Sequence, residues 1–200
     1  MLASLAKFLG AMADGPPVTR ISDGFANVPM TNQYGRELRF RDDLVGRRAL
    51  IVNTMFTVCR GTCPGTSSRL ASLRKILSPV FGDDLLIVSI SLDPEQDSPR
   101  ALRRYASIYG ADRVRDGLCD WQFLTGKPAD VERLRRSLGF YDLDLRVDGD
   151  LTRHAAVLYF GNPRKDRWAT LPSDLREPLL VEAIRRVAGF TFEQKYGIKG

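Results

Sequence analysis

The sequence predicts an α/β protein in which helices cover both faces of a β-sheet. Two observations support this fold class. Short apolar runs typical of buried strands alternate along the chain with amphipathic segments typical of surface helices. Residues that start or stop helices stand at the ends of the amphipathic segments. With 200 residues, of which 44% are hydrophobic, the chain is long enough for one well-packed domain.

The strands are predicted from runs of apolar residues. Ala49 to Phe56 is almost continuously apolar, which is typical of a strand at the centre of a parallel sheet. Residues 84–90 and 154–160 have the same character. Weaker strands are predicted at 121–126 and 167–171, and residues 35–46 read as a short hairpin-like strand.

The helices are predicted from apolar periodicity and from their end signals. Residues 66–77 place Leu70, Leu73, Ile76 and Leu77 on one face, and Pro79 is expected to end that helix. Ser98 and Pro99 match a helix cap and first helical residue before 100–110. Further helices are predicted at 128–139, where Gly139 stops the pattern, and at 175–189.

Charge and composition exclude several classes of function. The net charge of +6 comes from arginines scattered over predicted helices, without a dense basic run, which argues against nucleic-acid binding. No phosphate-binding glycine loop follows an early strand, so nucleotide chemistry has no support. No run approaches the ~20 apolar residues of a membrane span.

Residues 1–24 are expected to be a leader or tether, 25–190 the domain and 191–200 a tail.

Cys59 and Cys63 are the main candidates for chemistry, because they lie where a central strand ends and a helix begins. Ligands gather at the carboxyl ends of strands in open α/β sheets. Pro64 fits only the first turn of a helix, so Cys63 is expected at the helix start. There the backbone dipoles, together with Arg60 in the spacer, favour a thiolate, which is both the nucleophile and the metal ligand.

The spacing of the two cysteines leaves several interpretations open. Residues four apart across a turn can form a disulfide or bring both sulfurs to one metal. His154 is the only histidine in the chain and the obvious third ligand. Two thiolates and an imidazole favour copper over magnesium or calcium. A structural disulfide or two buried thiols fit the pair equally well, and Cys119 reads as a small core residue.

Four motifs in this order resemble the Sco/SenC family of copper-binding, thioredoxin-like proteins. They are Cys59-x3-Cys63-Pro64, "SISLDPEQDSP" at 89–99, "FLTG" at 123–126 and "HAAVLYF" at 154–160. The resemblance covers roughly residues 25–190 and implies an α/β, thioredoxin-like sheet flanked by helices, with an added N-terminal β-hairpin. In the family, the residues matching Cys59, Cys63 and His154 bind copper, and the two cysteines cycle between dithiol and disulfide.

The resemblance implies a metallochaperone for the dinuclear copper centre of cytochrome c oxidase, holding Cu(I) or Cu(II). The implied partners are the copper-receiving subunit of the oxidase, or another copper protein, and a periplasmic copper donor. The implied location is extracytoplasmic, in a bacterial periplasm, with a membrane anchor as an open alternative. The competing interpretation is a thiol–disulfide oxidoreductase that reduces the cysteines of that subunit or of another copper protein. A peroxidase is a third, but Phe56 replaces the threonine that its nucleophile motif needs.

Two residues depart from the family pattern. The spacer between the cysteines carries Arg60 and no carboxylate, and Arg153 stands where an aspartate often precedes the histidine. Both changes make the site more positive. They are expected to weaken the retention of a cation or to stabilise thiolates for redox chemistry.

Overall fold

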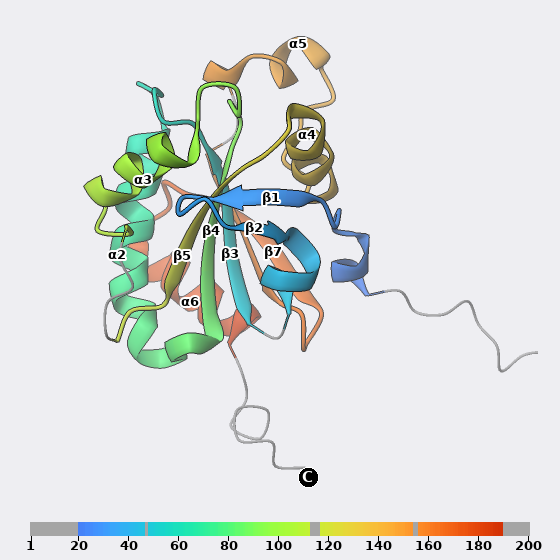
Figure 1. Cartoon of the computed structure of the whole chain (residues 1–200). Helices are drawn as coiled ribbons and strands as arrows, with labels where there is room; N and C mark the ends of the chain where they lie inside the picture. Colours follow the sequence, from blue (N-terminus) through green and yellow to red (C-terminus); the bar gives the residue numbers. More distant parts are fainter. Residues whose placement is uncertain (1–19, 47, 113–116, 154–155, 190–200) are drawn as a thin grey trace, which may run out of the picture.

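The structure is a computed structural model that describes residues 20–46, 48–112, 117–153 and 156–189. The described chain forms one seven-stranded sheet in the order β2-β1-β5-β4-β3-β6-β7, with helices on both faces (Figure 1). The α/β prediction is therefore confirmed. Among the described helices, none has the length and hydropathy that a membrane span requires.

The centre of the sheet is parallel. β3 (Ala49–Met55) pairs with β4 (Leu85–Ser91), and β4 pairs with β5 (Asp120–Thr125). All residues of β3 and β4 are buried, which explains why their sequences lack the polar alternation of a half-exposed strand. The predictions for both strands are confirmed within one residue at each end.

Antiparallel strands complete the sheet on both sides. β1 (Pro29–Asn32) and β2 (Glu37–Arg39) form the N-terminal hairpin, and β1 pairs with β5. At the other edge, β6 (Val157–Asn162) pairs with β3, and β7 (Arg167–Pro172) pairs with β6. The hairpin was expected, although residues 40–45, predicted as part of it, instead form the π-helix η2 (Phe40–Val45).

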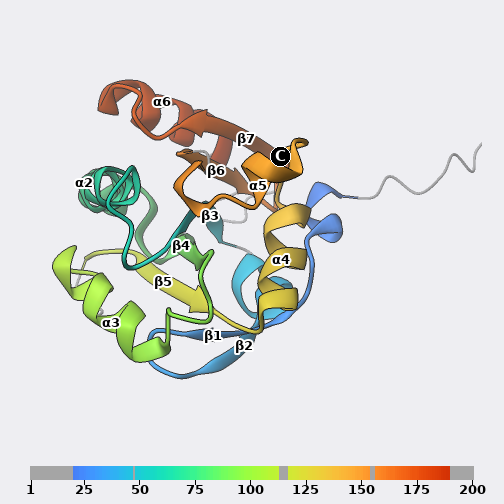
Figure 2. The same cartoon turned by 90° about the horizontal axis from the view of Figure 1, so that it is seen from above.

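Helices cover the two faces of the sheet unequally (Figure 2). One face packs against α2 (Cys63–Phe81), α3 (Pro99–Ile108) and α6 (Glu177–Ala188), and the other against α4 (Pro128–Ser137) and η2. The shorter elements are η1 (Ile21–Gly24), η3 (Gly82–Asp84), α5 (Leu145–Asp148) and η4 (Leu151–Arg153). None of these short elements was predicted from the sequence.

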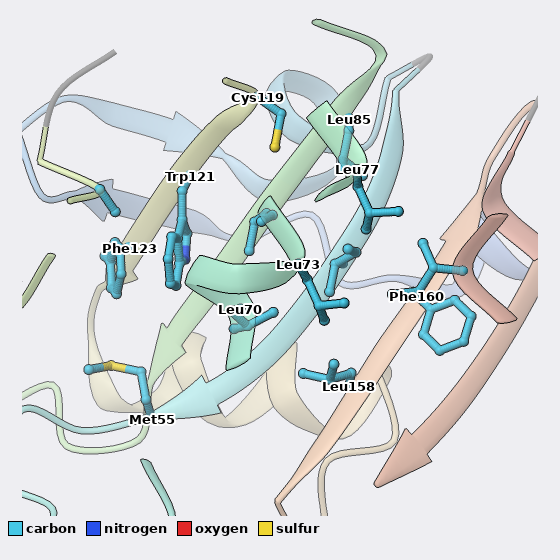
Figure 3. Close-up of a cluster of buried hydrophobic side chains, with 14 of the residues drawn as sticks. Met55, Leu70, Leu73, Leu77, Leu85, Cys119, Trp121, Phe123, Leu158 and Phe160 are labelled. Atoms are coloured by element: carbon cyan, nitrogen blue, oxygen red, sulfur yellow. The ribbon is translucent and has the colours of Figure 1, made fainter. Parts of the chain in front are cut away.

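The larger core lies between the sheet and α2. Leu70, Leu73 and Leu77 of α2 project onto the sheet, where they meet the side chains of Trp121 and Phe160 (Figure 3). Cys119 lies in the same core and is fully buried, so the prediction that it is a small core residue is confirmed. This apolar contact holds the first turn of α2, with Cys63, against the end of the sheet.

Two details of α2 differ from the sequence prediction. The helix does not end at Pro79 but continues to Phe81, and Ile76, predicted for the buried face, is 40% exposed. A proline inside a helix removes one backbone hydrogen bond. Burial of Phe81 in the core, followed by Gly82 with a positive φ of 57°, compensates for that loss and moves the helix end beyond the proline.

Candidate functional site

The loop between β3 and α2 carries both candidate cysteines. β3 ends at Met55, the Cys59 N–H donates to the Phe56 carbonyl at 3.2 Å, and α2 begins at Cys63 with Pro64 in its first turn. The structure thus confirms that the cysteine pair spans a strand end and a helix start. In the parallel pairing of β3 with β4, Met55 lies opposite Ser91, so both strands end beside this loop. The cysteine pair therefore lies at the carboxyl edge of the parallel strands.

The Cys59 and Cys63 side chains are in contact. All the cysteines of the chain are thiols, and the Cys63 thiol is hydrogen-bonded to Cys59. Cys59 is partly exposed, whereas Cys63 is only 1% exposed. The structure therefore brings together the two sulfur atoms that the sequence singled out, one accessible and one covered.

The pKa of Cys63 is raised to about 12. Burial is the largest cause, and the hydrogen bond to Cys59 is the second. The expectation of a thiolate at the helix start is therefore wrong for Cys63 in this dithiol form. A helix N-terminus favours a nearby anion modestly, but removing a thiolate from water costs more than that attraction returns. Arg60 does not offset this cost, because its side chain is exposed at the surface of the loop.

Helix α3 covers the first turns of α2. The Ser67 hydroxyl, one turn beyond Cys63, is hydrogen-bonded to the Tyr105 hydroxyl at 2.9 Å. The Tyr105 ring packs against Tyr109 and Phe123, and burial raises the pKa of the Tyr105 phenol. These buried neutral groups form a wall of low polarity around Cys63, which accounts for the direction of its pKa shift.

Asp97 anchors the opposite side of the cysteine loop, and sequence reasoning missed this role. Residues 93–97 form a turn after β4, and from it the Asp97 side chain reaches back to Thr57, two residues before Cys59. The only local signal was a proline-bracketed turn after the strand next to the cysteine strand. Such a turn does not reveal which segment its carboxylate contacts.

His154 lies outside the described residues, but the chain on either side of it is described. It is preceded by η4 and followed by β6, which begins at Val157. In the antiparallel pairing of β6 with β3, Val52 lies opposite Tyr159, so β6 begins where β3 ends. The sheet therefore returns the chain to the edge that carries the cysteine loop.

A cavity of about 550 Å³ adjoins this edge on the α4 side of the sheet. Its walls include Thr54 at the end of β3, Leu92 after β4, Phe140 after α4, and Leu151 and Arg153 of η4. The cavity thus lies directly beside the segment that leads to residue 154. A space of this size is comparable to a small ligand pocket.

An ion-pair network forms one wall of that cavity. The two terminal guanidinium nitrogens of Arg135 donate to the Asp148 carboxylate, at 2.6 and 2.8 Å, and Arg136 donates to the same carboxylate at 2.5 Å. Hydrogen bonding from Arg135 holds the pKa of Asp148 well below its usual range. The network fastens α5, and with it the start of the segment that leads to β6, onto α4.

Within the described ranges, no group of three or more histidine, cysteine, aspartate or glutamate side chains could hold a metal ion. The two cysteine sulfurs are the donors that the described site supplies, and the third predicted donor, His154, lies outside the described ranges. Two thiols in contact suit a soft cation or dithiol–disulfide chemistry.

Known proteins share this fold and sequence pattern. A solved SCO1/SenC family lipoprotein from Bacillus anthracis matches with a TM-score of 0.65 and 21% identity, over 82% of this chain and 94% of that one. ScoI of Arabidopsis thaliana, solved with copper bound, matches with a TM-score of 0.63 and 19% identity, over 81% and 96%. These likenesses confirm the thioredoxin-like fold with its N-terminal hairpin.

One curated relative, a putative copper-binding protein of Stutzerimonas stutzeri, is 29% identical over 134 residues. The match spans 66% of this chain and 60% of that protein's length. The sequence model of the family described as SCO1/SenC matches residues 25–189, from the N-terminal hairpin through the cysteine loop to the end of α6. The chain belongs to the SCO1/SenC family.

Proposed function

We propose that this protein binds copper and delivers it for assembly of the dinuclear copper centre of cytochrome c oxidase. In this proposal Cys59, Cys63 and His154 are the ligands. The observation that carries it is the contact between the partly exposed Cys59 and the buried Cys63 at the carboxyl edge of the parallel strands. Copper is the cargo of the protein, so it must be bound and also released.

The donor set fits copper better than the other common metals. Thiolate sulfur is a soft ligand that selects Cu(I), and imidazole is a ligand for either oxidation state. A coordinating thiol is deprotonated, so copper binding releases protons from the pair. Because the neutral thiol of Cys63 is strongly favoured without metal, copper affinity is expected to rise steeply with pH.

The relatives support this choice of cargo. Copper appears in the names of the Stutzerimonas relative and of the solved Arabidopsis structure. Because the matched region is 60% of that relative's length, its activity and partners are carried to this chain only as proposals. The proposed partners are the copper-receiving oxidase subunit, or another copper protein, and a copper donor in the same compartment.

The proposed compartment is extracytoplasmic, in a bacterial periplasm. The support is the structural likeness to a bacterial protein described as a lipoprotein. Residues 1–24 are proposed as the leader or tether and 25–190 as the copper-binding domain, followed by a tail at 191–200. Residues 1–19 and 190–200 lie outside the described ranges.

The second candidate function is thiol–disulfide exchange, and the unequal exposure of the cysteines favours it. The partly exposed Cys59 thiolate would attack a substrate disulfide, releasing one substrate thiol and forming a mixed disulfide. Cys63, after losing its proton, would then displace the second substrate thiol and form the Cys59–Cys63 disulfide. The substrate gains two electrons and the protein loses two.

His154→Ala separates the two candidates. If copper delivery is the function, the variant loses one of three donors, so affinity falls and Cu(II) binding in particular is lost. Dithiol–disulfide cycling should persist, because the cysteines carry that chemistry. The measurements are competitive titration with Cu(I) and Cu(II), spectra of the Cu(II) form, and reduction of a disulfide in a copper-free oxidase domain.

Cysteine variants provide the matched controls. Cys63→Ser should abolish tight copper binding, whereas Cys119→Ala, which removes a buried thiol elsewhere in the core, should leave it unchanged. Unchanged copper affinity and spectra in His154→Ala would remove the histidine from the site, and the oxidoreductase function would then be favoured.

A further inference from the structure

The Asp97 carboxylate is a fully buried acceptor placed directly behind the cysteine loop. Its side chain is 0% exposed and accepts hydrogen bonds from two hydroxyl groups, those of Thr57 at 2.5 Å and Ser91 at 2.6 Å. The backbone N–H of Thr57 also points to the carboxylate, with both oxygens at 3.2 Å. One side chain thus collects donors from two segments of the chain.

Asp97 itself is held on the rigid part of the fold. Its own N–H donates to the Asp93 carbonyl at 2.9 Å, and the Asp93 N–H donates to the Ser91 hydroxyl at 3.1 Å. The next residue, Ser98, caps α3 by accepting from the Ala101 N–H at 3.3 Å. The carboxylate is therefore attached on one side to the end of β4 and on the other to the start of α3.

The loop that Asp97 contacts has little packing of its own. Val58 is 66% exposed, and Arg60 and Gly61 are also exposed. Beyond Thr57, the turn closes through the hydrogen bond from the Cys59 N–H to the Phe56 carbonyl. Phe56 is buried in the core at the start of the loop, and Cys59 packs against that core, but the exposed residues between and after them gain little from apolar burial. The Asp97–Thr57 hydrogen bonds tie the segment between Phe56 and Cys59 to the end of β4 and the start of α3.

We propose that Asp97 is a positioning residue for the cysteine pair: through Thr57 it holds Cys59 at the distance from Cys63 that two-sulfur chemistry requires. The copper part of this inference rests on the proposed function, because it assumes that the pair binds copper. The positioning of Cys59 next to Cys63 does not depend on that function, since disulfide formation also needs the two sulfurs together. Groups that orient metal ligands typically change affinity by about 10–100-fold when they are removed.

The test uses the full chain with the variant Asp97→Ala and measures two properties. Cu(I) affinity, by chelator competition, should fall about 10–100-fold. In glutathione buffers, oxidised glutathione takes two electrons from Cys59 and Cys63, which form a disulfide, and becomes two molecules of reduced glutathione. The equilibrium constant for this oxidation should fall about tenfold. That corresponds to a midpoint about 30 mV less negative.

Two further variants keep the test decisive. Thr57→Val removes only the hydroxyl donor and conserves the shape of the side chain. It should lower both the Cu(I) affinity and the glutathione equilibrium constant by about threefold. If Asp97→Ala does not fold, this variant tests the positioning role in its place. Thr125→Val is the matched control, because the buried Thr125 hydroxyl has no hydrogen-bond partner among the described residues. It should leave both properties unchanged.

The outcomes separate the two proposals. Folded Asp97 and Thr57 variants with a wild-type glutathione equilibrium would overturn the positioning role, even if their unfolding midpoints fell, because a purely structural residue changes stability alone. A wild-type protein without copper affinity would instead refute the proposed function. The glutathione measurement would still decide the role of Asp97.

Discussion

The Cys63 thiol is hydrogen-bonded to Cys59, and Cys59 is partly exposed whereas Cys63 is buried. The pair is therefore asymmetric although the cysteines are four residues apart in a short loop. Because α3 and the core cover Cys63, only Cys59 is presented toward a partner protein. This asymmetry determines the order in which the cysteines react.

Alkylation of the reduced protein should modify Cys59 first. The thiolate is the reactive form, and burial raises the pKa of Cys63, so its thiol stays protonated at pH 8. Burial likewise raises the pKa of Cys119. Mass spectrometry after brief iodoacetamide treatment should find Cys59 modified at least about tenfold faster. Equal labelling of Cys63 in the folded protein, with urea-unfolded protein as the control, would contradict the asymmetry.

Oxidation should join Cys59 to Cys63 and leave Cys119 reduced. The first two side chains are already in contact, whereas Cys119 is fully buried just before β5, beneath α2. The check is peptide mapping without reduction. A bridge that contains Cys119 would mean that the core opens during oxidation. The midpoint potential should lie above about −300 mV, since a working dithiol is less reducing than a structural disulfide.

Asp148 should make the stability of the protein sensitive to acid. Its pKa is depressed by the hydrogen bonds from Arg135, so the folded state favours the carboxylate. That stabilisation is complete above the unfolded-state pKa of about 4 and is lost as the pH falls below it. Asp148→Asn should lower the free energy of unfolding by about 3 kcal/mol at pH 7, since it breaks a largely buried pair.

Urea unfolding of both proteins at pH 7, 4 and 3 measures this effect. The difference between them should shrink as the pH falls below about 4. The control is Glu182→Gln, which breaks the exposed pair between Glu182 and Arg186 and should change stability by about 0.5 kcal/mol or less. A difference for Asp148→Asn that is independent of pH would contradict an electrostatic role.

Arg74 should be required for the stability of the face that α2 covers. Its buried guanidinium donates to the Cys119 carbonyl at 2.7 Å and to the Gly110 carbonyl at 3.0 Å. Arg74→Met would leave two inward-facing carbonyls without these donors, at a cost of about 2–4 kcal/mol. Chemical denaturation checks this, with Lys75→Met on the exposed side of the same helix as the control. Equal effects of the two variants would refute the assignment.

The sequence by itself determined the order of strands and helices and the place of the cysteines between them. These properties are local: apolar runs report burial, and Pro64, Ser98 and Gly139 act within one turn of where they stand. The motifs that resemble the SCO1/SenC family likewise identified the family, because the positions that carry the resemblance are themselves short sequence segments.

Only the tertiary structure decided the environment of the site. The Asp97–Thr57 hydrogen bonds join residues 40 apart in sequence, and no local pattern states which segments a sheet brings together. The same reason explains why the pKa of Cys63 is raised, although its place at a helix start predicted a lowered pKa. The helix start around Cys63 is visible in the sequence, but the burial that outweighs it comes from α3 and the sheet. Phe81 extended α2 beyond Pro79 because a core contact outweighed a local preference.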